Sequence, residues 1–204
     1  MNWPVMPLHA TPLPRAACLA AALLLAACSA APPAEPPLKG ATIGGDFTLT
    51  GESGQPVSWS DFDGKYRIVY FGFTYCPDIC PTDVQHMTRG LAQFAKDDPQ
   101  AAAKVQPLFV SVDPERDTPA VLTEFTDAFS PDLIGLTGTP EQIEQVAKDY
   151  AVAYSRGAEQ PGGGYLMNHS TITYLFGPDG EPIATLPTDQ GAEAVTAELA
   201  RWVR

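Results

Sequence analysis

Hydrophobic residues in this chain gather in short segments separated by polar and glycine-rich turns, and two segments are almost continuously apolar. These are RIVYFGFT at 67–74 and VQPLFVSV at 105–112. Such runs are typical of central strands that are buried on both faces of a sheet. Pro107 has no N–H to donate, so we expect it near the start of its strand. Residues 47–50 and 56–59 flank a glycine-rich turn and predict a β-hairpin.

Four helices are predicted from start signals and apolar periodicity. The first opens at Pro81, and the last covers residues 192–203. Between them, Thr118–Pro119 and Thr139–Pro140 each place a capping hydroxyl before a proline at the first helical position. Gln142 completes a capping box in the second of these.

Further strands are expected at 133–136 and, as a strand–turn–strand unit, at 171–176 and 182–186. Strands that alternate with helices and end in a hairpin predict a layered α/β domain, with a mixed central sheet flanked by helices. A sulfur motif between the first buried strand and its helix fits a thioredoxin-like arrangement. We find no internal repeat, so residues 41–204 are predicted to form one domain.

The N-terminal region predicts export and lipid attachment. Residues 16–27 (AACLAAALLLAA) are too few to span a bilayer, but they match the apolar part of a secretory signal, with Arg15 as the flanking positive charge. Leu25-Ala-Ala-Cys28 resembles the bacterial lipobox, whose cysteine becomes the lipid-modified first residue. An uncleaved anchor with an incidental cysteine is the alternative. We therefore expect a lipoprotein signal peptide over residues 1–27.

Residues 28–40 are rich in proline and predict a semi-extended membrane tether. The chain as a whole has 45% hydrophobic and 18% charged residues, which is typical of a folded protein. Its net charge of −12 becomes −13 once residues 1–27 are removed, because that segment holds Arg15 and no acidic residue. Nucleic-acid affinity depends on cationic side chains that displace phosphate counterions, so a nucleic-acid partner is excluded.

Of the four cysteines, Cys18 leaves with the signal and Cys28 is committed to lipid, so Cys76 and Cys80 remain. They lie in YCPDICP at a strand end and a helix start, where we expect the helix dipole to lower the pKa of the thiols. In an oxidising compartment such a pair is a structural disulfide, a redox couple or a metal site. Three intervening residues allow both sulfurs to face one metal ion. Soft thiolates select Cu(I), and an added imidazole allows Cu(II) as well.

Histidines that could join the cysteines are few. His9 leaves with the signal, and His86 is expected to be a solvated helix residue. His169 follows a glycine stretch and precedes a strand; metal-ligand and structural roles both remain open for it. Met167 is a weaker candidate for a soft ligand, and we expect it to pack.

The segment Asp113-Pro-Glu-Arg-Asp117 follows a buried strand. It is adequately explained as a turn that leads into the Thr118 cap, with Arg116 paired to a nearby carboxylate. The alternative is a loop that faces a partner beside the thiols. Ligands of such sheets collect beyond the carboxyl ends of the strands, where this loop and both cysteines are expected.

Three segments together resemble the Sco/SenC family of copper-binding, thioredoxin-like proteins: FGFTYCPDICP at 71–81, SVDPERDTP at 111–119 and His169-Ser170. The resemblance covers about residues 43–204, with the motifs in the same order. It implies copper, as Cu(I), Cu(II) or both, with Cys76, Cys80 and His169 as the ligands.

The resemblance also implies a metallochaperone that assists assembly of the binuclear copper centre of cytochrome c oxidase. The alternative is a thiol–disulfide oxidoreductase, with Cys76 and Cys80 as catalytic residues, that reduces the cysteines of the copper-receiving subunit. That subunit is the expected partner, together with other copper chaperones or thioredoxin-like reductants. The resemblance favours the periplasmic face of the inner membrane, whereas Ser29 after Cys28 leaves a location elsewhere open. Ser170 and Thr171 stand where thioredoxin-type reductases place a cis-proline, which favours copper.

Two positions depart from the family pattern: Asn168 replaces an aspartate before the histidine, and Tyr75 replaces a frequent histidine before Cys76. An aspartate that orients the imidazole would be lost here. Residues expected to surround the ligands or to meet a partner are Asp78, Asp113, Arg116 and Asn168.

Overall fold

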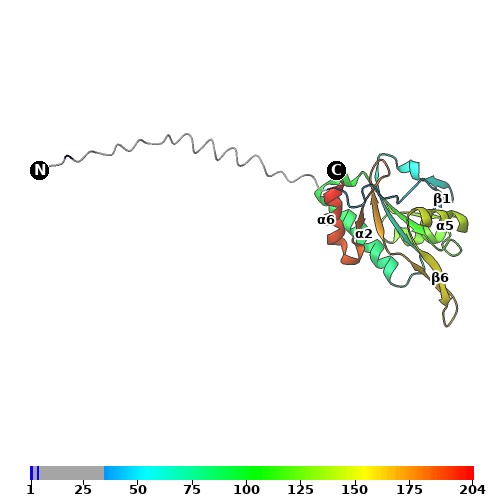
Figure 1. The fold of residues 1–204 in the computed structure, drawn as a ribbon. Helices are drawn as coiled ribbons and strands as arrows, with labels where there is room; N and C mark the ends of the chain where they lie inside the picture. The colour runs from blue at the N-terminus through cyan, green and yellow to red at the C-terminus, as the bar shows by residue number, and fades with distance from the viewer. Residues whose placement is uncertain (2–3, 5–34) are drawn as a thin grey trace. The chain divides into compact units, whose positions relative to one another are not determined.

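The computed structural model describes residue 1, residue 4 and residues 35–204 (Figure 1). The expected signal peptide, Cys28 and most of the expected tether lie outside the described residues and stay predictions. Residues 36–204 form one compact unit. Its strands are β1 (Thr48–Gly51), β2 (Pro56–Ser58), β3 (Tyr66–Gly72), β4 (Val105–Ser111), β5 (Ile134–Thr137), β6 (Tyr154–Glu159), β7 (Tyr165–His169), β8 (Thr173–Phe176) and β9 (Pro182–Leu186). Its helices are η1 (Trp59–Phe62), α2 (Ile79–Asp97), α3 (Pro99–Ala102), α4 (Pro119–Asp127), α5 (Pro140–Asp149), η2 (Thr188–Gln190) and α6 (Ala192–Trp202).

Seven strands of this unit form a mixed sheet in the order β2-β1-β5-β4-β3-β8-β9. β3, β4 and β5 are parallel neighbours, while β1 pairs antiparallel with β5 and β8 pairs antiparallel with β3. Pro107 pairs with β3, and the pairing of β4 with β5 begins only at Leu108, so the proline stands near the strand start as expected. The predicted α/β fold with a mixed sheet and an N-terminal hairpin is confirmed.

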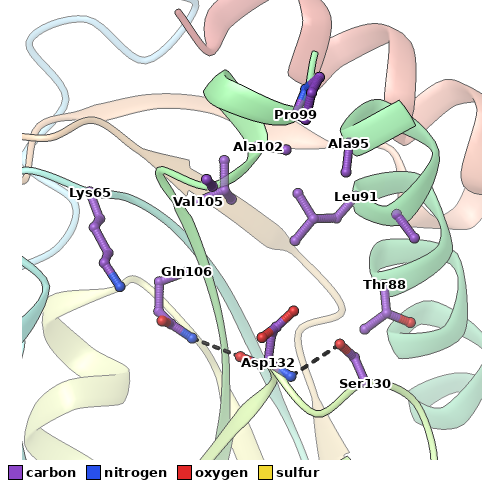
Figure 2. A pocket seen from close by; sticks show the side chains of 12 residues that line it. Lys65, Thr88, Leu91, Ala95, Pro99, Ala102, Val105, Gln106, Ser130 and Asp132 are labelled. Atoms are coloured by element: carbon purple, nitrogen blue, oxygen red, sulfur yellow. Dashed lines mark hydrogen bonds between the residues drawn. The ribbon is translucent and has the colours of Figure 1, made fainter. Parts of the chain in front are cut away.

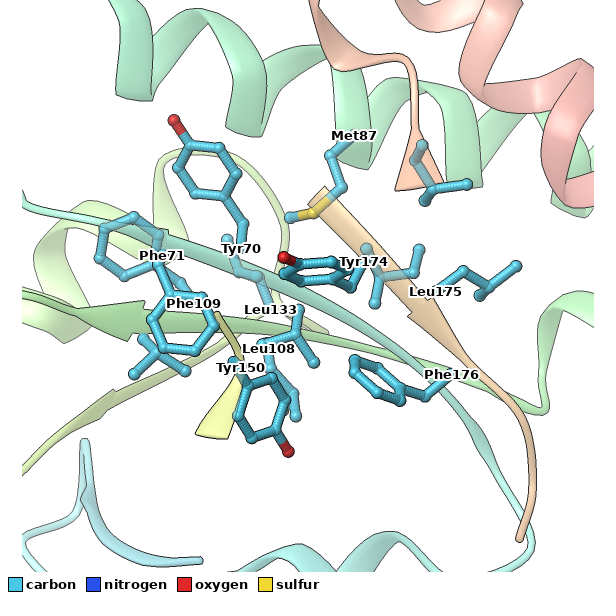
Figure 3. Close-up of a cluster of buried hydrophobic side chains, with 14 of the residues drawn as sticks. Tyr70, Phe71, Met87, Leu108, Phe109, Leu133, Tyr150, Tyr174, Leu175 and Phe176 are labelled. Carbon is cyan, nitrogen blue, oxygen red and sulfur yellow. The ribbon is translucent and has the colours of Figure 1, made fainter. Parts of the chain in front are cut away.

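β3 and β4 form the centre of the sheet because their side chains are apolar on both faces. Every residue of β3 is buried. On one face Tyr70 stacks on Phe109 of β4 with ring centres 6.2 Å apart, and on the other Phe71 packs against Tyr150 at 5.5 Å. Figure 3 shows Tyr70 and Tyr150 on opposite sides of the sheet. Burying one such side chain contributes roughly 1.5–3 kcal/mol, so these strands form a firm base for the loops at their ends.

Helix α2 begins at Ile79, two residues before the expected start at Pro81. The prediction was wrong there because a proline fits the first helical turn, where N–H groups have no partner within the helix. The predicted caps are confirmed: Thr118 accepts a backbone hydrogen bond in α4, and Thr139 and Gln142 form a capping box in α5. Figure 1 shows α2 and α6 side by side on one side of the sheet and α5 on the other. No helix among the described residues is long and apolar enough to cross a membrane.

A separate two-stranded sheet of β6 and β7 was not expected from the sequence. The side chains of β6 are mostly exposed, so they give no apolar alternation that would mark a strand. Residues 162–164 at the tip of this hairpin all have positive φ, a backbone conformation that glycine adopts without strain. Tyr154 pairs with His169 at the other end. The hairpin thus carries His169 on a defined strand instead of a flexible stretch.

Candidate metal centre

Cys76 and Cys80 lie where the chain passes from β3 into the first turn of α2. Both are free thiols; Cys76 is half-buried and Cys80 is buried. The backbone N–H of Cys80 donates a hydrogen bond to the Cys76 sulfur at 3.4 Å. The first N–H groups of a helix lack partners within the helix, so this sulfur satisfies one of them. The two sulfur-bearing residues are thereby held around one helix start.

Burial raises the pKa of the Cys80 thiol, and the neighbouring Cys76 acts in the same direction. The expectation that the helix start lowers the thiol pKa was therefore wrong for Cys80. Loss of water around its sulfur outweighs the helix dipole. Cys80 is a protonated thiol at neutral pH, and a metal ion that binds it must displace that proton.

The imidazole of His169 lies against Cys80. Its Nε2 is 3.2 Å from the Cys80 sulfur, and its Nδ1 is 2.9 Å from the carbonyl oxygen of Ser170. A carbonyl only accepts hydrogen bonds, so we assign the proton to Nδ1, and the Nε2 lone pair then faces Cys80. The rings of Tyr70 and Phe73 meet the imidazole edge-on. Burial lowers the pKa of His169 below its ordinary value of 6.5, which favours the neutral, metal-binding form.

A buried polar cluster lies beside Cys80. The Tyr70 hydroxyl donates to Asp83 Oδ2 at 3.1 Å, and burial raises the pKa of both groups. His86, which we expected to be solvated, is half-buried with its Nδ1 2.7 Å from the carbonyl oxygen of Thr188. That expectation was wrong because η2 packs against α2 and offers this acceptor. His86 anchors η2, and in the described part of the chain it makes no hydrogen bond or ion pair with either cysteine.

Asp117 ties the loop after β4 to the loop that carries Cys76. Its buried carboxylate accepts hydrogen bonds from the Thr74 N–H at 3.1 Å, the Thr74 hydroxyl at 2.7 Å and the Ser111 hydroxyl at 2.6 Å. Burial raises the pKa of this carboxyl. Sequence reasoning placed Asp117 only in a turn and missed this role. The available signal was an acidic residue between a buried strand and a Thr-Pro cap.

Arg116 pairs with Asp113, as the sequence predicted. Its Nη1 also donates to the Tyr165 carbonyl oxygen at 2.9 Å, and its guanidinium lies 3.7 Å from the Tyr165 ring centre and 4.9 Å from that of Tyr75. Asp113 is only 2% exposed. The Asp113–Asp117 loop therefore turns these two side chains inward, between the Cys76 loop and β7.

Asp78 and Asn168 lie near Cys76 and His169 but, in the described part of the chain, do not hydrogen-bond to the imidazole. Asp78 is exposed just before α2, and its side chain makes no helix-capping hydrogen bond. Asn168 is exposed and donates to Ser155 Oγ across the hairpin at 3.4 Å. Within residues 35–204 neither side chain has a hydrogen bond to the His169 imidazole, whose Nδ1 is held by the Ser170 carbonyl. The aspartate-to-asparagine departure thus leaves the imidazole oriented.

Two hollows open on either side of Cys76. The first, of about 360 Å³, is lined by Phe73, Cys76, Pro77, Asp78, Ile79, Leu166, Met167, Asn168, His169 and Thr171. The second, of about 480 Å³, lies between the Cys76 loop and α4 and is lined by Thr74, Tyr75, Cys76, Pro81, Val121, Glu124, Phe125, Ala128 and Phe129. Among the described residues, no group of three or more His, Cys, Asp or Glu side chains is close enough to hold a metal ion as it stands. A shared ion therefore needs side-chain movement around the Cys80–His169 pair.

A further hollow of about 350 Å³ lies at the opposite ends of β3 and β4 (Figure 2). Lys65, Gln106 and Asp132 are among its lining residues, and the Gln106 side chain donates to the Asp132 carbonyl oxygen at 2.7 Å. The lining includes no cysteine or histidine. The sulfur and imidazole side chains thus lie at the carboxyl ends of the parallel strands, where this class of sheet binds its ligands.

Comparison with known proteins gives consistent matches. Residues 35–204 match the protein family described as SCO1/SenC. Protein SenC of Rhodobacter capsulatus is 48% identical over 139 residues, which are 68% of this chain and 60% of that protein. The human mitochondrial SCO1 homolog is 38% identical over 162 residues, 79% of this chain and 53% of the relative. The chain thus spans little more than half the length of these relatives.

Solved structures of the same fold include proteins with bound copper. Bradyrhizobium japonicum ScoI with copper bound is similar at a TM-score of 0.70 and 37% identity, over 79% of this chain and 99% of that chain. Yeast Sco1 with copper bound is similar at a TM-score of 0.71 and 33% identity, over 79% of this chain and 88% of that chain.

Proposed function

The chain belongs to the SCO1/SenC family, and from that premise we propose that it is a copper metallochaperone that assists assembly of the binuclear copper centre of cytochrome c oxidase. Copper is its cargo, held by the Cys76 and Cys80 sulfurs and by Nε2 of His169. Two soft sulfurs and one imidazole nitrogen suit Cu(I), and the nitrogen extends the site to Cu(II).

The observation that carries this proposal is the 3.2 Å approach of His169 Nε2 to the Cys80 sulfur, two groups 89 residues apart in sequence. The Ser170 carbonyl holds the proton on Nδ1, so the lone pair of Nε2 is directed at the sulfur. A histidine that served only to fill space would not need this orientation. The copper-bound relatives support the same cargo.

Apolar side chains around the cysteines and the histidine support a protein partner. Apart from Met1, the large apolar side chains that are exposed in the described part of the chain flank these residues in sequence: Tyr75, Ile79, Leu166 and Ile172. Exposed apolar residues that gather around a site are typical of interaction surfaces. We propose that the copper-receiving subunit of the oxidase docks here, as would other copper chaperones or thioredoxin-like reductants that exchange copper or electrons with this site.

The test compares three measurements on His169→Ala in a strain that depends on this protein: copper affinity, thiol exchange rate and assembly of the oxidase copper centre. Loss of a residue that only orients a metal ligand typically lowers metal affinity about 10–100-fold, so we expect loss of the ligand itself to lower Cu(II) affinity at least about 10-fold. Assembly of the oxidase copper centre should fall with it. Thiol exchange should be nearly unchanged, because it needs only the two sulfurs. Normal assembly despite lost copper binding would contradict the chaperone role and favour the thiol–disulfide oxidoreductase instead.

We also propose that residues 1–27 are removed as a lipoprotein signal and that Cys28 carries the lipid that tethers residues 41–204 to the periplasmic face of the inner membrane. The lipobox match at Leu25–Cys28 supports this. Mass spectrometry of the N-terminal peptide tests it. A lipid-modified Cys28 at the N-terminus is the expected result, and an intact segment 16–27 in the purified protein would contradict it.

A further inference from the structure

The hairpin that carries His169 is not held by the main sheet. Among the described strands, β6 and β7 pair only with each other. His169, at the C-terminal end of β7, nevertheless lies 3.2 Å from a sulfur on α2. Beyond the short connections to Val152 and to β8, side-chain contacts hold the position of β7.

One side chain makes several of these contacts. The guanidinium of Arg116 lies 3.7 Å from the ring centre of Tyr165, the first residue of β7, and its Nη1 donates to the Tyr165 carbonyl oxygen at 2.9 Å. Its Nε pairs with Asp113, which in turn accepts a hydrogen bond from the Tyr165 hydroxyl at 2.8 Å. A planar guanidinium can stack on a ring and donate hydrogen bonds at the same time, which an ammonium group cannot do as well.

The same guanidinium contacts the segment that carries the cysteines. It lies 4.9 Å from the ring centre of Tyr75, the residue before Cys76, and 5.9 Å from that of Phe73. The Phe73 ring in turn meets the His169 imidazole edge-on at 5.8 Å. Arg116 thus touches both segments that carry the proposed copper ligands.

Strand geometry connects Arg116 to the imidazole. Side chains alternate between the faces of a strand, so Tyr165, Met167 and His169 share one face of β7, and this is its less exposed face. A shift of Tyr165 is therefore transmitted along the strand to His169. We propose that Arg116 is a positioning residue for copper binding, which clamps Tyr165 against the Cys76 loop and so sets the distance between His169 and Cys80. This rests on the proposed function, since it takes His169 to be a copper ligand.

The first experiment measures Cu(II) affinity of the full-length protein in detergent by competition with a chelator. Arg116→Met keeps an unbranched apolar stem and removes the guanidinium with its charge and donors; we expect Cu(II) affinity to fall about 10-fold or more, with weaker nitrogen coupling in the EPR spectrum. In a His169→Ala background the same substitution should change affinity by less than about 2-fold, because the two residues act through one ligand.

Arg156→Met is the matched control. Its guanidinium also lies 3.7 Å from the Tyr165 ring centre, but it pairs with Glu115 and Glu159 and, within the described residues, does not lie over the Tyr75 ring as Arg116 does. We expect the Cu(II) affinity of Arg156→Met to stay within about 3-fold of the wild-type value, because exposed ion pairs contribute little energy.

The second experiment needs no copper. Amide hydrogen exchange of the metal-free protein should be faster in β6 and β7 of Arg116→Met and unchanged in α2. Unchanged copper affinity in Arg116→Met, or an equal loss in the His169→Ala background, would overturn the inference. If His169→Ala alone leaves copper affinity unchanged, the proposed ligand set fails. In that case the hydrogen exchange of Arg116→Met still tests the contact between Arg116 and Tyr165. Unchanged exchange in β6 and β7 would overturn that contact as well, and faster exchange would uphold it.

Discussion

Replacing Asp117 with alanine should both destabilise the protein and loosen the loop that carries Cys76. The carboxylate accepts three hydrogen bonds, two from Thr74 and one from Ser111, and is fully buried. Alanine leaves these donors without an acceptor in a site that excludes water.

The magnitude follows from those three bonds. Each hydrogen bond to a charged group contributes about 1.5–3 kcal/mol. Burial raises the pKa of Asp117, so the cost of dehydrating its carboxylate offsets part of the sum, and we take the low end. Three bonds at the low end sum to about 4.5 kcal/mol, and the dehydration offset leaves an expected loss of about 3 kcal/mol in the free energy of unfolding. For a domain of this size that corresponds to a melting temperature lowered by roughly 6–12 °C.

Thermal and denaturant unfolding of the full-length protein measure the effect. Asp127→Ala is the control, because Asp127 is an exposed carboxylate of α4, and such surface changes stay within about 0.5 kcal/mol. Asp117→Asn keeps one acceptor oxygen, so its melting temperature should lie between those of the wild type and Asp117→Ala. A melting temperature of Asp117→Ala within about 2 °C of that of the control would refute the reasoning, because it corresponds to a loss of less than about 1 kcal/mol in the free energy of unfolding.

Three further results are expected. In Gly72→Ala the new Cβ would lie 3.2 Å from the Cys80 sulfur and within 2.9 Å of two aromatic carbons, so unfolding measurements should show a loss of about 1–3 kcal/mol; wild-type stability would contradict the packing. Burial lowers the pKa of His169 in the folded protein, so the unfolded chain binds the proton more tightly; stability should be full above about pH 6.5 and fall as pH decreases through the folded pKa. Between pH 7 and 5 the melting temperature of His169→Asn should change less with pH than that of the wild type. The same pH dependence in both proteins would count against this. Leu166→Ser should lower oxidase assembly while copper binding is kept, whereas Ala158→Ser on the same hairpin should change neither; equal assembly in both variants would rule out the docking surface.

The central part of the fold could be predicted because its signals are local. The apolar runs of β3 and β4 and the capping hydroxyls of Thr118 and Thr139 each act within a few residues of the chain. The position of Cys76 after β3 and of Cys80 in the first turn of α2 follows from the same elements.

The hairpin of β6 and β7 could not be predicted in this way. Its exposed side chains carry no apolar alternation, and its contacts include hydrogen bonds to the Asp113–Asp117 loop, about 50 residues away. The raised pKa of Cys80 was missed for a related reason. A helix start is visible in the sequence, but the burial that outweighs it comes from β3, β7 and the core.

The central claim is that one copper ion is shared by the sulfurs of Cys76 and Cys80 and the imidazole of His169. X-ray absorption spectroscopy of the copper-loaded, reduced full-length protein tests it most directly, because sulfur and nitrogen scatter differently. We predict one copper per chain with two sulfur ligands and one imidazole nitrogen, loss of the nitrogen in His169→Ala, and loss of copper in the Cys76→Ser/Cys80→Ser double variant. Copper that stays bound in the double variant with an unchanged ligand shell would contradict the account.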